Sequence, residues 1–323
     1  MKIQIPSKVA DRKKKRVKTA IILLSSAALL LPGAEFIGTQ AALAASNASN
    51  ASSVSTSDSD KVLNNFQSLL KANNLRDADI YLNKNIEKTT QHHASLMVLY
   101  LENARIKALP ILDQKFYPEE IQKELSSIYK RNDHIDNLIK KAKTQKLKKL
   151  LIEVKNSGYK MRTSEGMYYL TMDYSRFERY QNNVKDDIAA YITIQMTETD
   201  KYASSDAALT IGYQELVNRA LIQENFLLEY PTSNRSGQVK TLFNDYKLYV
   251  FYGLNNTPLF SYEENTMQPN ARKAYEFISQ IPNTNKSELR NQLKQFMKLV
   301  KEEKYKKTAK VQNWLTENIN EKQ

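Results

Sequence analysis

Residues 224–246 read ENFLLEYPTSNRSGQVKTLFNDY and predict two helices joined by a tight turn. Tyr230-Pro231-Thr232-Ser233 ends the first helix, because proline lacks the backbone N–H that would continue it and disfavours helical geometry in the preceding residue. Ser236 then offers a hydroxyl that can cap the second helix. We therefore expect a helical hairpin built from helices over ~204–228 and ~237–252.

The same stretch resembles the inter-helix signature of bacterial tetratricopeptide-type repeats. In that signature, a helix that ends in Phe and Tyr-Pro-x-Ser runs into a second amphipathic helix. The resemblance covers one hairpin of ~23 residues, and nothing at an offset of about 34 residues repeats it. It implies helix–turn–helix packing at this point and assigns no family to the chain.

Residues that break helices are scarce in the rest of the chain: only five glycines and six prolines follow residue 44. We therefore predict an all-α fold, a multi-helix array with tetratricopeptide-like hairpins. The longest helix is expected over ~118–156, opened by Pro118 and two acids. Its apolar positions follow a 4-3 spacing and then slip in register, which indicates local unwinding: Ile121, Leu125, Ile128, Ile135, Ile139, Ala142, Leu147, Leu150, Leu151 and Val154. A further helix is expected to start at Ser164-Glu165.

The first 44 residues have the three-part pattern of a secretory signal. A basic cluster over 13–16 precedes the apolar run 19–31, and Ala42-Leu43-Ala44 supplies the small residues of a cleavage site. The run is shorter than the ~20 residues of a membrane span. Residues 45–59 read as a flexible spacer of Ser, Asn and Ala. We divide the remainder into an N-terminal helical hairpin region, 60–156, and a C-terminal helical domain, 157–323.

The chain carries a formal net charge of +13 and no cysteine. The missing cysteine excludes disulfides, thiol catalysis and a lipid-modified N-terminal cysteine, and is typical of exported proteins of Gram-positive bacteria. Six lysines fall within ten residues and form either a solvated helix face or a contact for an anionic wall polymer or lipid headgroup. We do not expect nucleic acid as a partner, given the compartment and because lysine lacks the bidentate fork of arginine. The cluster comprises Lys140, Lys141, Lys143, Lys146, Lys148 and Lys149.

Two carboxylates are candidates for glycoside hydrolysis. Glu165 and Asp173 lie eight residues apart, a little over two turns of the helix expected there, so they would share one face. The competing interpretation is a helix N-cap with an acid in its first turn. His92, His93 and His134 lack the spacing of a metal site and are interpreted as solvated. No motif indicates a cofactor.

The stretch 253–268, GLNNTPLFSYEENTMQ, is expected to be the one long loop. Long loops on rigid scaffolds often carry function, and this loop displays two aromatic residues, Phe260 and Tyr262, beside Asn255 and Asn256. A binding groove is expected where the loop meets helices ~164–180 and ~204–228. Arg162 and Arg176 are further polar residues expected there.

Together these features predict an exported, non-catalytic binding or scaffold protein of the bacterial cell envelope, secreted and associated with the wall. Its expected partner is an anionic wall polymer or an envelope protein. One alternative is an enzyme that cleaves wall glycan with Glu165 and Asp173. Another is a membrane-tethered subunit of an envelope complex, which requires the leader to stay uncleaved.

Overall fold

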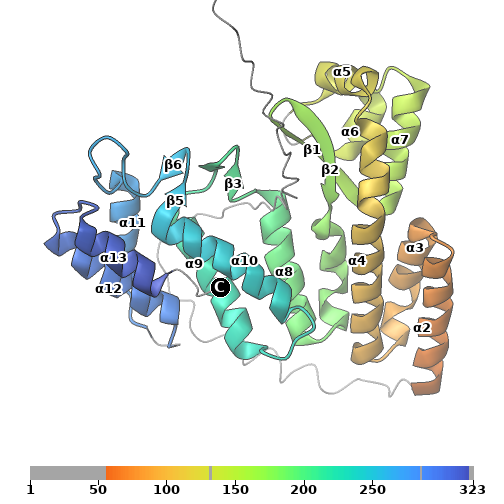
Figure 1. Ribbon diagram of the computed structural model, residues 1–323. Helices are drawn as coiled ribbons and strands as arrows, with labels where there is room; N and C mark the ends of the chain where they lie inside the picture. Colours follow the sequence, from red (N-terminus) through yellow and green to blue (C-terminus); the bar gives the residue numbers. More distant parts are fainter. Residues whose placement is uncertain (1–55, 131–132, 284–285, 320–323) are drawn as a thin grey trace, which may run out of the picture.

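The computed structural model describes residues 56–130, 133–283 and 286–319. Over these residues the chain is mostly helical, with three short antiparallel strand pairs, and the helices form an extended array (Figure 1). The all-α prediction is therefore confirmed. Within the described ranges, no helix is long and apolar enough to cross a membrane. The leader 1–44 and residues 45–55 of the spacer lie outside the described residues.

The first half of the array begins with α2, α3 and α4, which pack against one another. Three shorter helices and a β-hairpin follow: β2 packs against α4 and α7 against α3, while α5 packs on β2 and α6 on α7 (Figure 1). The bounds are α2 Thr56–Lys71, α3 Leu75–Asn85, η1 Ile86–Lys88, α4 Gln91–Asp113, η2 Gln114–Phe116, α5 Glu119–Ile128, α6 Ile135–Lys141, α7 Gln145–Ser157, β1 Tyr159–Ser164, β2 Met167–Met172 and η3 Tyr174–Asn183.

Among the described residues, the second half contains six helices, α8 to α13, and two very short strand pairs. The helix α8 passes from the first half into the second, and α9 packs against α8, α10 and α11. The bounds are α8 Asp186–Asp200, β3 Ser204–Ser205, β4 Ala208–Leu209, α9 Tyr213–Glu229, α10 Ser236–Tyr252, β5 Gly253–Leu254, β6 Thr257–Pro258, α11 Pro269–Gln280, α12 Glu288–Glu302 and α13 Ala309–Asn318.

The spacer predicted over 45–59 is wrong in its last four residues, which belong to α2. Ser59 is fully buried, and its hydroxyl accepts a hydrogen bond from the backbone N–H of Thr90 at 3.1 Å. This contact with the start of α4 stabilises the first turn of α2. A segment with the composition of a linker is therefore helical here, because α4 provides a hydrogen-bond partner for its side chain.

The single long helix predicted over ~118–156 is wrong, because the chain breaks it into α5, α6 and α7. Glu124 on α5 accepts the backbone N–H groups of Lys143 and Thr144 and also the Thr144 hydroxyl. The Thr144 hydroxyl in turn accepts the N–H of Leu147 and so caps α7. A straight helix of this length would extend ~58 Å. The breaks instead bring Leu125, Leu138 and Leu151 into one core.

The helix expected to start at Ser164 is also wrong, because residues 159–172 form the β1–β2 hairpin. Ser164 pairs with Met167 across a two-residue turn in which Glu165 and Gly166 have φ of 50° and 76°. Two positive φ values match the twist of a tight hairpin turn. The helical character resumes only in η3, where Phe177 and Tyr180 are buried.

Side chains pair one edge of this hairpin and tie a helix end beside the other. The carboxamide of Gln122 donates to the carbonyl of Tyr168 and accepts its N–H, both at 2.8 Å, as a neighbouring strand would. Asp113 accepts the N–H of Leu170 at 2.6 Å on the same edge. On the β1 side, Arg162 donates to the carbonyl oxygens at the end of α8, at Thr199 and Asp200. The β2 edge is thus paired within the molecule, and the end of α8 lies beside β1.

The helical hairpin predicted from residues 224–246 is confirmed by α9 and α10, which pack closely against each other. The first helix is shorter than expected, because residues 204–209 form β3 and β4 around a turn at Asp206 and Ala207 with φ of 51° and 57°. Ser236 is the first residue of α10, and its hydroxyl donates to the carbonyl of Ser233. The tetratricopeptide-like packing of further hairpins stays a prediction.

Buried ion pairs join the layers of the array. Arg235, in the turn between α9 and α10, donates from Nε to Glu102 Oε2 of α4 at 3.0 Å. The other oxygen of Glu102 accepts the hydroxyl groups of Tyr174 and Tyr191, each at 2.5 Å. Both charged groups are buried, so they compensate each other in a medium where a lone charge would be costly.

A second buried cluster surrounds Asp79 on α3. The guanidinium of Arg105 is fully buried and lies 3.2 Å from the Asp79 carboxylate, and Arg176 and Arg179 approach the same group. Burial favours a raised pKa for Asp79, but the three guanidinium groups outweigh it and hold the pKa below its usual value. Asp79 therefore stays ionised and ties α3 to α4 and η3.

Two glycines offer a matched test of the Arg105 position. Gly158 ends α7 with φ +83°, and a Cβ there would lie 2.5 Å from Arg105 Cζ, whereas a Cβ on Gly166, with φ +76°, meets nothing within 4 Å. Alanine costs about 1–2 kcal/mol at either position because of the left-handed backbone. We expect Gly158→Ala to lower the free energy of unfolding in urea by a further ~2 kcal/mol or more, because Arg105 must leave Asp79. Equal losses in the two variants would contradict this packing.

Candidate functional site

The turns of the three strand pairs are joined in series at one edge of the molecule (Figure 1). The hydroxyl of Ser164 donates to the Asp206 carboxylate at 2.7 Å. The carboxamide of Asn256 donates to the carbonyl of Asp206 at 2.6 Å, and its backbone N–H donates to Ala207 at 2.8 Å. The first six residues of the stretch 253–268, expected to be one loop, thus form the β5–β6 hairpin and meet the other two turns. Asn256, predicted to bind a ligand, uses its carboxamide and its backbone N–H in this contact between turns.

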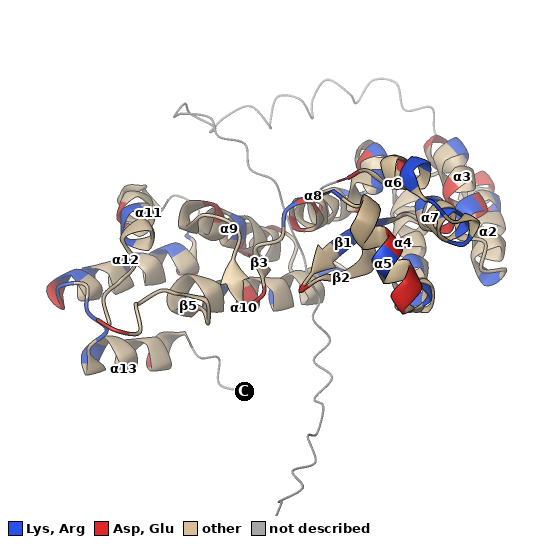
Figure 2. Ribbon diagram, turned by 90° about the horizontal axis from the view of Figure 1, so that it is seen from above, with Lys and Arg blue, Asp and Glu red and all other residues tan. Residues whose placement is uncertain are grey.

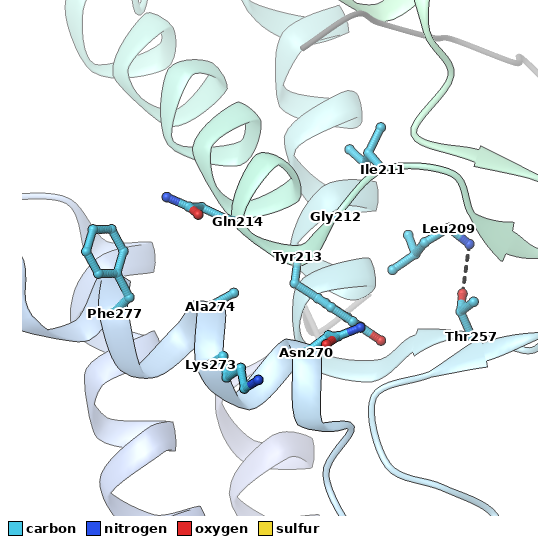
Figure 3. Close-up of a pocket in the computed structure, with 10 residues that line it drawn as sticks. All are labelled: Leu209, Ile211, Gly212, Tyr213, Gln214, Thr257, Asn270, Lys273, Ala274 and Phe277. Carbon is cyan, nitrogen blue, oxygen red and sulfur yellow. Dashed lines mark hydrogen bonds between the residues drawn. The ribbon is translucent and has the colours of Figure 1, made fainter. Parts of the chain in front are cut away.

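An open pocket of ≈ 500 Å³ lies between the start of α9 and the length of α11, and we name it the α9–α11 groove (Figure 3). Leu209 and Ile211 give it apolar surface, and the ring of Phe277 stands at one end with 55% of its surface exposed. Lys273 makes no hydrogen bond or ion pair with the described residues. The lining residues are Leu209, Ile211, Gly212, Tyr213, Gln214, Thr257, Asn270, Lys273, Ala274 and Phe277.

A second, more enclosed pocket of ≈ 180 Å³ involves the same β5–β6 hairpin, and we name it the Tyr262 pocket. Thr257 lines the groove while Pro258 lines this pocket, so the hairpin separates the two. Three of the loop residues predicted to bind a ligand come together here. Asn255 and Tyr262 line the rim, and Phe260, which is buried, contributes to the floor.

The lysine cluster is spread over α6, the connection to α7 and α7 itself (Figure 2). Lys141 pairs with Asp133 at 2.5 Å and Lys146 with Glu120 at 2.9 Å, while Lys143 donates to Ser127. Lys140 is exposed and close enough to Asp136 to help lower the pKa of that carboxyl, after the larger effect of Lys155. Lys148 and Lys149 are exposed on α7 and have no partner among the described residues.

Glu165 and Asp173 do not form a carboxylate pair. Glu165 lies at the exposed tip of the β1–β2 hairpin, and Asp173 follows the far end of β2. The six residues of β2 separate them by ~20 Å, against the ~5–9.5 Å of a glycosidase pair. Asp173 accepts the Ser175 hydroxyl at 2.6 Å and lies 3.8 Å from Lys160. The prediction that these two carboxylates share one face of a helix is therefore wrong.

The two arginines predicted to lie in a groove have structural contacts instead. Arg162 donates to the end of α8 and stacks over the Tyr202 ring at 4.9 Å. Arg176 donates to Asp79 at 3.1 Å. The groove-lining residues of α11, Lys273 and Phe277, were not among the residues singled out in the sequence. The sequence does hold one signal for the groove, because Phe277 lies off the apolar face of an otherwise amphipathic helix.

The histidines are distributed without a common centre. His93 lies 3.1 Å from Asp60 and contacts the Thr90 hydroxyl, whereas His134 is exposed and accepts the N–H of Asp136 at the start of α6. His92 is exposed. In the part of the chain that the structure describes, no three His, Asp or Glu side chains gather as metal ligands do.

Glu198 is a buried carboxyl that the sequence does not reveal. It lies on α8, accepts the hydroxyl of Tyr246 at 2.5 Å, and is 3.7 Å from the guanidinium of Arg219. Burial raises the pKa of Glu198 to about 7, and Arg219 offsets only part of that effect. The group therefore changes charge near neutral pH inside the contact of α8, α9 and α10.

Comparisons of the chain with protein families, curated proteins and solved structures find no match. The chain's own features therefore bear on its function: the predicted leader, the α9–α11 groove, the Tyr262 pocket and the two lysines of α7 that have no partner among the described residues.

Glu198 predicts a pH dependence of stability. The unfolded chain releases this proton near pH 4.5, while the folded chain holds it until about pH 7, so folding is favoured at low pH. The free energy of unfolding should fall by up to about 3 kcal/mol between these values. We expect Glu198→Gln, which stays neutral, to lack this decrease. Urea unfolding of both proteins from pH 4.5 to 8 tests it, and parallel profiles would contradict the raised pKa.

Proposed function

We propose that the chain is an exported, non-catalytic binding protein of the bacterial cell envelope, and that the α9–α11 groove receives a protein partner. The observation that supports this most is the groove itself, an open channel of mixed apolar and polar lining with the exposed ring of Phe277 at one end. Exposed apolar surface of this kind is a frequent mark of protein–protein contact.

The two helices that flank the groove run in the same general direction. Gln214 of α9 lines the groove with α11, while Glu224, further along α9, accepts the hydroxyl of Ser287 just beyond α11. Ile281, directly after α11, is exposed as Phe277 is. A channel between two such helices suits an amphipathic helix of a partner.

The charged groups favour binding over catalysis. The buried carboxylates Asp79, Glu102 and Glu198 are held by arginine and tyrosine side chains that join helices. The candidate pair Glu165 and Asp173 is dispersed along β2. Export itself rests on the leader pattern, and N-terminal sequencing of the exported protein separates a cleaved form from a membrane-tethered subunit.

Site-specific cross-linking tests the groove. A photoreactive amino acid at Phe277 should form a discrete cross-link to one envelope protein in the exporting cells, whereas the same group at Leu248 on α10 should not. Leu248 is a matched control, since it is 42% exposed and does not line the groove. Ala274→Arg, which fills the groove, should abolish the product without changing the unfolding midpoint. Equal cross-linking from Phe277 and Leu248 would show that the partner does not bind specifically in the groove.

An anionic wall polymer is a second candidate partner, supported by the two lysines of α7 that no described residue pairs with. We expect Lys148→Gln/Lys149→Gln to weaken co-sedimentation with teichoic-acid-containing walls several-fold at low salt, because two positive charges are lost from one exposed face. Lys294→Gln/Lys298→Gln on α12 removes the same charge elsewhere and serves as the control. If both double variants sediment alike, or if binding is insensitive to salt, the polymer does not bind at α7.

A further inference from the structure

We propose that the Tyr262 pocket binds a single sugar ring that carries a carboxylate, as a unit of an acidic wall glycan. The inference goes beyond protein binding in the α9–α11 groove and uses different residues. It rests on four observations about the pocket, which are its aromatic floor, its exposed ring, its unpaired amides and its single charge.

The floor of the pocket is apolar and rigid. Phe251 and Phe260 are buried, and both meet the ring of Phe296 edge-to-face, with centroids 5.4 and 6.3 Å away. Leu315 of α13 completes the floor. The pocket's ≈ 180 Å³ corresponds to roughly six water molecules, which suits one ring and not a polypeptide segment.

Tyr262 provides a fixed aromatic face at the mouth. Its side chain is 71% exposed, yet its hydroxyl donates to the carbonyl of Asn255 at 3.0 Å. The ring is thereby held in position over the pocket instead of moving freely in solvent. An aromatic face held this way can contact the C–H surface of a sugar, while the polar edges of the sugar stay free to hydrogen-bond.

The rim of the pocket carries side chains that can hydrogen-bond to the hydroxyls of a sugar and pair with one carboxylate. The carboxamides of Asn255 and Asn265 and the ammonium of Lys307 make no hydrogen bond within the described residues. A carboxamide both donates and accepts, as sugar hydroxyls do. Lys307 is the only charged residue among those lining the pocket, and it is positive. The arrangement therefore favours a ligand with several hydroxyls and one negative charge.

The backbone of the rim is already in place. Lys307 N–H donates to the carbonyl of Asn265 at 2.7 Å, and Asn265 N–H donates to Ser261 at 3.0 Å. At the far side, Gly253 turns α10 directly into β5 with φ +75°, where any Cβ would overlap Thr257 and Leu259. Such order before binding reduces the entropy that a ligand must overcome.

Tryptophan fluorescence tests the proposal directly. Trp314 is the only tryptophan of the chain, and its ring centroid lies 5.9 Å from that of Phe251 in the floor. Titration of the exported protein with N-acetylmuramic acid should give a saturable change in emission. N-acetylglucosamine, which lacks the carboxylate, should require at least a tenfold higher concentration.

Variants separate the parts of the site. Tyr262→Ala should abolish the response to both sugars, whereas Tyr117→Ala, on another exposed tyrosine, should leave it intact. Lys307→Gln should reduce the affinity for the acidic sugar to that for the neutral one. The proposal is overturned if neither sugar changes the emission, if Tyr262→Ala binds normally, or if an aspartate-containing dipeptide competes better than the acidic sugar. Ala274→Arg in the groove should have no effect, so this result is independent of protein docking.

Discussion

One buried ion pair fixes how the two halves of the array meet. Glu102 lies in the middle of α4, and Arg235 lies in the turn that joins α9 to α10. Tyr174 of η3 and Tyr191 of α8 donate to the same carboxylate. The Glu102 side chain therefore joins α4 to three other segments, which are η3, α8 and the α9–α10 turn. Removing either charge would strand the other in the core, at about 3–5 kcal/mol. Because this turn positions α9 and α10, the groove and the Tyr262 pocket are both placed by the same contact.

Local signals in the sequence predicted part of the fold. Pro231 marked the turn of the α9–α10 hairpin, because its effect depends only on its neighbours in the chain. The break before α7 depends on Glu124, which reaches Thr144 twenty residues later, and no local pattern shows that hydrogen bond. The β1–β2 hairpin has a local signal, a Glu165-Gly166 turn between β-prone segments, but the aromatic residues that follow also fit helical spacing, which predicts a helix instead.

The candidate sites were predictable to different degrees. Asn255, Phe260 and Tyr262 are close in sequence, so their gathering around one pocket followed from a single segment. The groove joins α9 to α11, whose lining residues are some sixty positions apart along the chain, and its shape depends on tertiary packing. The lysine cluster looked uniform in sequence, but Asp133 and Glu120 neutralise two of its members only because the chain folds back there.

The covered edges of the β1–β2 hairpin bear on self-association. A free strand edge invites pairing with another copy and is a common start of aggregation. Here Gln122 and Asp113 pair with the β2 edge, and Arg162 and Lys160 hold the end of α8 beside β1. In a chain without cysteine, and hence without disulfides to lock the fold, these contacts leave a second copy little of this hairpin to extend, so strand addition at this point is disfavoured.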